Sequence, residues 1–389
     1  MSKPTILDEL SWIWIEKLQT VSGLSAPFVG GLIGLFVFLL NFALGRYAEH
    51  FTIVSIETFV EFIAMLAACI VIAYLITSIL YLIRILKDLP KLMNMTLEGD
   101  EITNELLQEI KHAFANKRAY YGLIILIMMP FVMTDSWFYL VRPDRNQLLL
   151  NENQWTLAFE IYGVVEAYFI EYLIAMLIWI IINIQKNINL LGNVKFRSYI
   201  KFDIFTIEEL GGRRKAMDLI KEIAIRYFTC LTLTILTFSI PLEIAILRED
   251  TSFYLASKIM YIIQEIIYIF LLILGLHYIW AIYIEIRNLF DKYILDELRN
   301  IDAIYSEKRN ELHMKLSRAE ADKNKNYEEI KQLSTALEII NSDRESLTQI
   351  AKNSYNISTT ITIASSFIGS MVIPSLTMIK LFQEILKSG

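Results

Sequence analysis

Long apolar runs alternate with short polar connections along most of the chain. A helix needs roughly 18 to 20 apolar residues to cross about 30 Å of hydrocarbon. None of the runs shows the short, alternating pattern of a membrane β-barrel strand. The pattern therefore predicts an all-α polytopic membrane protein with about seven transmembrane helices. The predicted spans are residues 27–45, 59–83, 119–141, 157–182, 226–247, 260–286 and 357–379.

The segment before the first span has a different pattern. Residues 5–18 combine apolar and polar residues in the manner of an amphipathic helix, and Trp12 and Trp14 suit the headgroup zone of a bilayer. We therefore expect an interfacial amphipathic helix within residues 1–22. The acidic residues before the first span are unlike the flank of a cleavable secretory signal, so this span should be retained. Within it, small residues predict close helix packing, namely Gly30, Gly31 and Gly34.

A second amphipathic region precedes the last span. Apolar residues recur at helical spacing in two sets, and the polar segment Ala321 to Asn326 separates them. This predicts a helical hairpin, with one arm continuing the sixth span and the other leading into the seventh. The hairpin either links two spans or serves assembly or gating, because its apolar face needs a partner. The predicted domains are 1–22 (interfacial helix), 23–287 (six-span bundle), 288–356 (hairpin and assembly region) and 357–389 (last helix).

Composition and charge agree with membrane insertion. Hydrophobic residues make up 55% of the 389 residues, charged residues only 20%, and the mean hydropathy is +0.45. Lysine and arginine concentrate between spans two and three and between spans four and five, so the N-terminus should be cytoplasmic. We expect a plasma membrane protein with helices projecting into the cytoplasm. The net charge of −6 gives no reason to expect a nucleic-acid partner.

Acidic residues lie inside several predicted spans, mostly in their outer halves, and tyrosines accompany them. Ionisable groups at membrane depth are costly unless they have partners or line water, so each suggests function. An acidic cavity with aromatic walls suits inorganic cations or a small amine ligand. Alternatively, basic residues pair with some of these acids and outer water reaches the rest. The candidates are Asp135, Glu160, Glu166, Glu171, Glu243, Glu265, Tyr162 and Tyr261.

Small polar residues cluster on one side of the last predicted span. They are Ser358, Thr362, Ser365, Ser366, Gly369 and Ser370, mainly at i, i+3 and i+4 spacing. Such a face either lets helices pack closely or lines an aqueous path in which hydroxyls replace part of an ion's hydration shell. Phe367 is a candidate gate, and Pro374 should kink or end the regular helix near Ser370.

One helix cannot enclose a pore, whereas several copies around an axis can. The pattern therefore favours a homo-oligomeric cation channel, gated by a ligand or by the environment. A second hypothesis is a secondary transporter that relays protons or cations through Glu166, Glu265 and His277. A third is a membrane sensor or scaffold whose hairpin binds a cytoplasmic partner.

The architecture resembles the insect odorant and gustatory receptor channels. The resemblance rests on seven spans, a cytoplasmic N-terminus, inward-projecting helices and a hydroxyl-bearing last span. It implies a tetramer in which the last helix lines the pore and the projecting helices assemble it. The gustatory signature is Thr-Tyr, five apolar residues and Gln-Phe. Here Ser354-Tyr355 stands at its start, but Ile361 and Thr362 occupy the Gln-Phe positions.

Signatures of enzymes are missing from the sequence. The four histidines are scattered without metal-ligand spacing, and no nucleotide-binding loop or nucleophile elbow occurs. The two cysteines, Cys69 and Cys230, lie in apolar surroundings and suit a helix core. We therefore expect no enzymatic activity, no cofactor and no metal site. The expected partners are the lipid bilayer, further copies of the chain, inorganic cations and a small ligand.

Overall fold

The computed structural model describes residues 13–47, 56–92, 95–97, 104–106, 108–110, 112, 116–136, 154–193, 195, 200–202, 211–247, 255–319, 327–352 and 357–388. Helices dominate these residues, which confirms the predicted all-α class, and one short antiparallel strand pair joins two connections. The elements are α1 (Trp14–Ser22), α2 (Ala26–Tyr47), α3 (Ile56–Leu92), β1 (Met95–Leu97), α5 (Lys117–Ser136), α7 (Gln154–Leu191), β2 (Ile200–Phe202), α9 (Gly211–Leu247), α10 (Leu255–Ala319), α11 (Tyr327–Lys352) and α12 (Ile357–Ser388).

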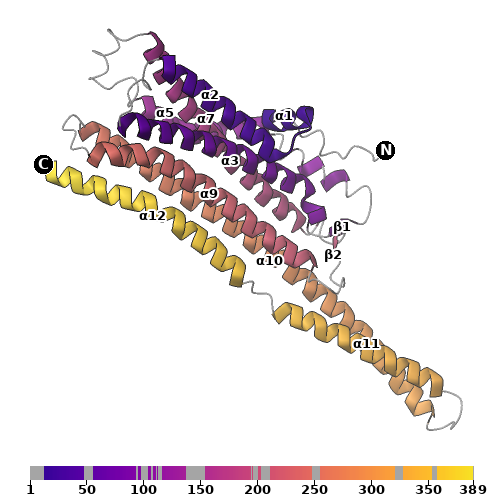
Figure 1. Cartoon of the computed structure of the whole chain (residues 1–389). Helices are drawn as coiled ribbons and strands as arrows, with labels where there is room; N and C mark the ends of the chain where they lie inside the picture. Colours follow the sequence, from indigo (N-terminus) through magenta and orange to yellow (C-terminus); the bar gives the residue numbers. More distant parts are fainter. Residues whose placement is uncertain are drawn as a thin grey trace.

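The long helices lie side by side in one bundle (Figure 1). Helix α3 packs against α2, α7 and α9, and α7 also contacts α5 and α10. Helix α12 lies at the edge of the bundle, where its neighbours are α9 and α10. The last helix therefore has one side on the bundle and another side that the described part of the chain leaves open.

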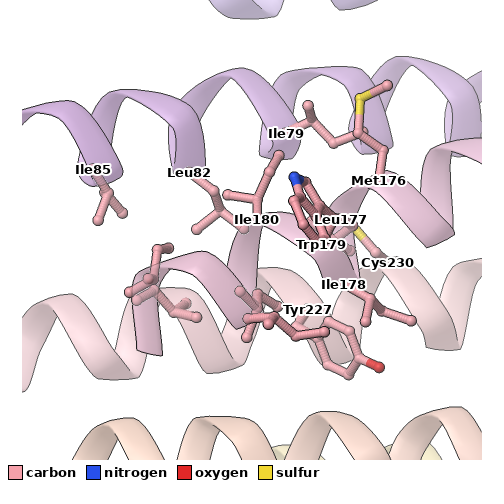
Figure 2. Close-up of a cluster of buried hydrophobic side chains, with 14 of the residues drawn as sticks. Ile79, Leu82, Ile85, Met176, Leu177, Ile178, Trp179, Ile180, Tyr227 and Cys230 are labelled. Carbon is pink, nitrogen blue, oxygen red and sulfur yellow. The ribbon is translucent and has the colours of Figure 1, made fainter. Parts of the chain in front are cut away.

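The core lies where α3, α7 and α9 meet (Figure 2). Leucine, isoleucine and methionine side chains from α3 and α7 interdigitate there, and Tyr227 and Cys230 close the layer from α9. Residues 173–184 of α7 are all buried, so this helix is enclosed on every side along three turns. A helix that is apolar all round must be surrounded by other helices or by lipid, and α7 is the central helix of the bundle.

Five helices are long and apolar enough to cross a bilayer, which supports an integral membrane protein. The qualifying segments are Ala26–Tyr47, Phe62–Lys87, Leu157–Leu191, Tyr261–Ser317 and Ser358–Gln383. The two remaining predicted spans, 119–141 and 226–247, fall on α5 and α9. Within the described residues these two helices do not meet the same requirement of length and composition. They nevertheless pack inside the same bundle.

The sixth predicted span and the first hairpin arm form one continuous helix, α10. Its second half projects beyond the bundle, and α11 runs back along it (Figure 1). Ile301, Leu333 and Leu347 are buried in the hairpin. Ion pairs cross it from Lys315 to Glu329 at 2.9 Å and from Arg344 to Asp302 at 2.7 Å. The predicted turn at 321–326 lies outside the described residues.

Helix α1 overlaps the predicted N-terminal helix at residues 14–18 and continues to Ser22, while residues 1–12 lie outside the described part of the chain. Helix α1 ends at Gly23, whose φ of 64° is the left-handed conformation that glycine adopts without strain. Ile15 is fully buried, and Glu16 forms an ion pair with Lys87 of α3. Trp14 lies 6.2 Å from the ring of Phe169 in α7. Helix α1 is therefore tied to the bundle by both apolar and charged contacts.

Two of the three predicted packing glycines bring α2 against α3. A Cβ atom on Gly30 would meet the carbonyl oxygen of Ala73 at 2.4 Å, and one on Gly34 would meet that of Cys69 at 2.7 Å. No atom lies within 4 Å of the corresponding position on Gly31. The prediction is thus confirmed for Gly30 and Gly34 and wrong for Gly31, which lies on the open side of the same helix.

This difference provides a matched test on neighbouring turns. Gly34→Leu should separate α2 from α3 and destabilise the protein by about 1 to 3 kcal/mol, because backbone atoms cannot move aside for the side chain. Gly31→Leu should keep or raise the thermal unfolding midpoint of the detergent-solubilised protein, because leucine favours helix over glycine and meets no atom there. Equal midpoints for the two variants would show that α2 does not pack against α3 as described.

Candidate functional site

Helix α12 has a buried stripe that faces the bundle. Its residues recur at three-, four- and seven-residue spacing, and the Ser370 hydroxyl is hydrogen-bonded within the bundle. Thr232 of α9 donates a hydrogen bond to the Ser370 hydroxyl at 2.7 Å, and Ser370 donates to the Ser366 carbonyl at 2.8 Å. This stripe fixes the rotation of α12 on α9 and α10. It consists of Thr359, Ile363, Ser370, Pro374, Thr377 and Leu381.

A second stripe of α12 faces away from the bundle. We call it the hydroxyl stripe; it consists of Ser358, Thr362, Ser365 and Gly369. Ser358, Ser365 and Gly369 are exposed and Thr362 is partly exposed. Four residues of an α-helix advance about 6 Å, so the stripe covers nearly 17 Å of helix length. The Thr362 hydroxyl donates to the Ser358 carbonyl at 2.8 Å, and Ser365 donates to the Thr362 carbonyl at 3.2 Å.

These internal hydrogen bonds bear on what the stripe can face. Each hydroxyl that donates to its own helix keeps oxygen lone pairs directed outward. Those oxygens can accept from water or approach a cation, and the bonded proton incurs no penalty in hydrocarbon. The described geometry therefore suits an aqueous path and also tolerates lipid. Only the accumulation of four small or hydroxyl-bearing positions on one open stripe favours the aqueous path.

The remaining predicted pore and gate residues divide between the two sides. Ser370 lies on the buried stripe and Ser366 lies between the stripes, partly exposed. The ring of Phe367 packs against Phe228 of α9 at 5.9 Å. Pro374 is buried inside α12 and does not end the helix, which continues to Ser388 because its buried face stays packed beyond the proline. Phe367 and Pro374 thus face their own bundle.

Among the predicted acidic residues, Glu166 has the best-defined surroundings. Its side chain lies between α2, α3 and α7, where Asn41 donates a hydrogen bond to Oε2 at 2.7 Å. The thiol of Cys69 lies 4.0 Å from Oε1. Asn41 is only 3% exposed, whereas Glu166 is partly exposed, so the pair is partly buried in the bundle. A carboxyl group with an amide donor can hold a proton or take part in binding a cation.

The other predicted acids whose side chains are described do not line an open outer cavity. Glu171 of α7 is 0% exposed and Glu265 of α10 is 4% exposed, so both are enclosed within the bundle. Tyr162 and Tyr261 are partly exposed on the same two helices. The side chains of Asp135, Glu160 and Glu243 lie outside the described residues, although α5, α7 and α9 carry their backbones. In the described part of the chain, no three His, Cys, Asp or Glu side chains converge as a metal site.

Two contacts that the sequence analysis missed hold these elements together. Asn41 interrupts the apolar run of α2, and this polar residue at membrane depth is the signal that could have identified it as a partner of Glu166. Gly275 of α10 faces Tyr227 of α9, whose hydroxyl donates to the Leu271 carbonyl at 2.6 Å. No sequence pattern marks this contact, since glycine in a long helix has many uses.

Comparison with known proteins adds no family. No protein-family model matches the chain, and no curated protein or solved structure matches it either. The function must therefore be argued from the residues and geometry of this chain.

Proposed function

We propose that this protein is a homo-oligomeric, cation-permeable membrane channel whose pore is lined by α12. One observation carries the proposal: the hydroxyl stripe of α12 faces away from the bundle that its own chain forms. Serine and threonine in a lipid-facing helix gain nothing from that position. Around a symmetry axis, the same stripes from several chains surround a polar path.

The continuation of the stripe supplies a gate. With about 100° of rotation per residue, Val372 and Leu376 follow Gly369 on the same line along the helix. Both are exposed, at 49% and 53%. A ring of such side chains excludes water when the pore is narrow, which is how hydrophobic constrictions close channels. Val372 and Leu376 therefore replace Phe367 as the proposed gate, and Lys380 and Gln383 make the stripe polar again beyond them.

Assembly of several copies has support from the hairpin. Exposed apolar side chains remain on both of its arms after α10 and α11 have packed together. Such side chains are stabilised by burial against another surface, and in our proposal that surface is the hairpin of the next subunit. The resemblance to insect odorant and gustatory receptor channels suggests a tetramer. The side chains are Leu295, Ile304, Met314, Leu316 and Ile339.

The topology of the proposal follows the charge pattern. Seven spans, with α5 and α9 included, place the N-terminus and the hairpin in the cytoplasm and the end of α12 outside the cell. We propose the plasma membrane as the site of action and a ligand or an environmental change as the stimulus. Hydroxyl and carbonyl oxygens along the pore would favour cations over anions.

Reconstitution tests the proposal directly. The purified full chain in a planar bilayer, under a cation gradient, should produce discrete current steps whose reversal potential follows the cation. Chemical crosslinking of the detergent-solubilised protein should give a single closed oligomer. A monomer that carries flux without discrete steps would contradict the channel and support a carrier. Intact oligomers that stay silent under every stimulus tried would favour a sensor or scaffold.

A secondary transporter remains the second candidate because of one feature, the partly buried, hydrogen-bonded pair of Glu166 and Asn41. A carrier depends on such a carboxyl group for each cycle, whereas a pore along α12 does not pass through it. Glu166→Gln keeps an oxygen that accepts from Asn41, so the bundle should stay folded. The channel predicts that currents in this variant match the parent. Transport lowered at least roughly a hundredfold would instead assign the carboxyl group an obligatory relay role.

A further inference from the structure

A polar cavity of about 250 Å³ lies between the end of α7 and the middle of α10. Asn189, Gly192 and Asn193 line it from the α7 side. Glu285 and Lys292 are among the α10 residues that line the other side. The cavity is separate from the hydroxyl stripe and from Glu166, so its occupant is a question independent of the pore.

The cavity lies where both helices leave their apolar stretches. Helix α7 ends at Leu191, directly before two of the lining residues. On α10, the long apolar run ends with Glu285, which Arg287 and Asp291 follow within two turns. Because apolar stretches match the hydrocarbon and charged residues match the headgroup region, the cavity opens at the boundary between bilayer and water.

One end of the cavity is built to accept hydrogen bonds. In the amide orientation that gives every atom a partner, Asn189 Nδ2 donates to both carboxylate oxygens of Glu285, at 2.7 and 2.9 Å. Gln185 Nε2 in turn donates to Asn189 Oδ1 at 2.9 Å. These hydrogen bonds hold the Glu285 carboxylate in place. The C-terminus of α7 beside it carries the partial negative charge of a helix end. Both features favour an ammonium group.

The other end of the cavity donates hydrogen bonds. Lys292 lies seven residues after Glu285, which is two turns and about 10 Å further along the same face of α10. Asn288 lies between them on that face and also lines the cavity. An ammonium and an amide are good partners for a phosphate group. The cavity is thus lined by an acceptor and a donor that lie two helical turns apart on α10.

We propose that this cavity binds a phosphoethanolamine group, with its ammonium on Glu285 and its phosphate toward Lys292. The group carries opposite charges on a two-carbon linker, short enough to fit between two side chains whose origins are about 10 Å apart. Phosphatidylethanolamine in the bilayer or a soluble phosphoethanolamine compound could supply it. Phosphocholine fits worse, since its quaternary nitrogen is bulkier and has no N–H to donate to the carboxylate.

Native mass spectrometry of the full chain in detergent tests the site. With equal amounts of each lipid added, phosphatidylethanolamine should bind at least roughly tenfold tighter than phosphatidylcholine, the difference that one charge-assisted hydrogen bond gives. Lys292→Gln should weaken the binding of both lipids about equally, because both carry the phosphate group, and Glu285→Gln should remove the preference. Glu328→Gln and Lys331→Gln make the same charge changes at exposed positions of α11 and should leave it intact.

Two further arms complete the experiment. Displacement of the lipid by soluble phosphoethanolamine would show that the headgroup suffices, whereas selective lipid binding without displacement would identify the bilayer as the source. Equal binding of the two lipids would overturn the proposal. So would unchanged binding of both lipids by Lys292→Gln, a substitution at an exposed position that should leave the thermal unfolding midpoint as it is.

Discussion

Replacing Ser365 by leucine should nearly abolish conduction. The side chain lies on the hydroxyl stripe and is exposed, so in the proposed assembly every subunit would place a leucine in the path. One leucine from each subunit would form a ring around the pore, and this ring would extend the apolar constriction of Val372 and Leu376 by about two turns toward the start of α12. A longer dewetted segment should lower single-channel conductance at least roughly tenfold. Single-channel recording in planar bilayers measures the effect.

The adjacent residue provides the control. Ala364 is also exposed but lies about 100° around the helix from Ser365, away from the hydroxyl stripe. Ala364→Leu adds the same side chain to the same turn and should leave conductance at the level of the parent. The account of α12 fails if Ala364→Leu blocks conduction as strongly as Ser365→Leu, or if both variants conduct normally as intact oligomers.

The second large effect concerns folding and falls on Gly275. A Cβ atom there would lie 1.8 Å from Cε1 of Tyr227, whose ring is fully buried against α10. Gly275→Ala therefore displaces the ring and breaks the hydrogen bond from Tyr227 to the Leu271 carbonyl. Overpacking and an unsatisfied buried hydroxyl together should cost about 2 to 6 kcal/mol. Thermal unfolding followed by tryptophan fluorescence measures the loss.

A double variant separates this clash from a general intolerance of α10. Tyr227→Leu in the Gly275→Ala background removes the clashing ring, so the double variant should be more stable than Gly275→Ala alone. Gly163→Ala in α7 is the matched control, because no atom lies within 4 Å of its added Cβ position. This control should keep or raise the unfolding midpoint, since alanine favours helix by about 1 kcal/mol. A double variant no more stable than Gly275→Ala, together with a lowered midpoint in Gly163→Ala, would refute the packing of α9 on α10.

The sequence predicted the elements well because membrane helices are marked by their length and composition. Apolar runs located α2, α3, α7, α10 and α12, and the amphipathic period located the hairpin. The packing prediction for α2 held for Gly30 and Gly34, which lie together on the side that packs against α3, but not for Gly31. These features depend only on residues that are close together in the sequence, so the sequence of one helix is enough to predict them.

The rotation of each helix against its neighbours was not predictable in the same way. Ser366 and Ser370 share hydroxyl chemistry and helical spacing with Ser365, yet Ser370 packs against Thr232 of α9. The contact between Glu166 and Asn41 joins residues 125 positions apart, and that between Tyr227 and the Leu271 carbonyl joins residues 44 apart. These pairings depend on which faces meet, and only the assembled bundle determines that.

The most direct test of the central claim is cysteine accessibility along α12. The native cysteines suit this test, because Cys69 and Cys230 are only 4% and 0% exposed and should not react. Single cysteines introduced at residues 358 to 369 would be treated with a charged thiol reagent during recording. The account predicts current block at Ser358, Thr362, Ser365 and Gly369, with no block at Ala364 or Ile368. Block that ignores this helical period, or that fails at all four positions, would contradict a pore along α12.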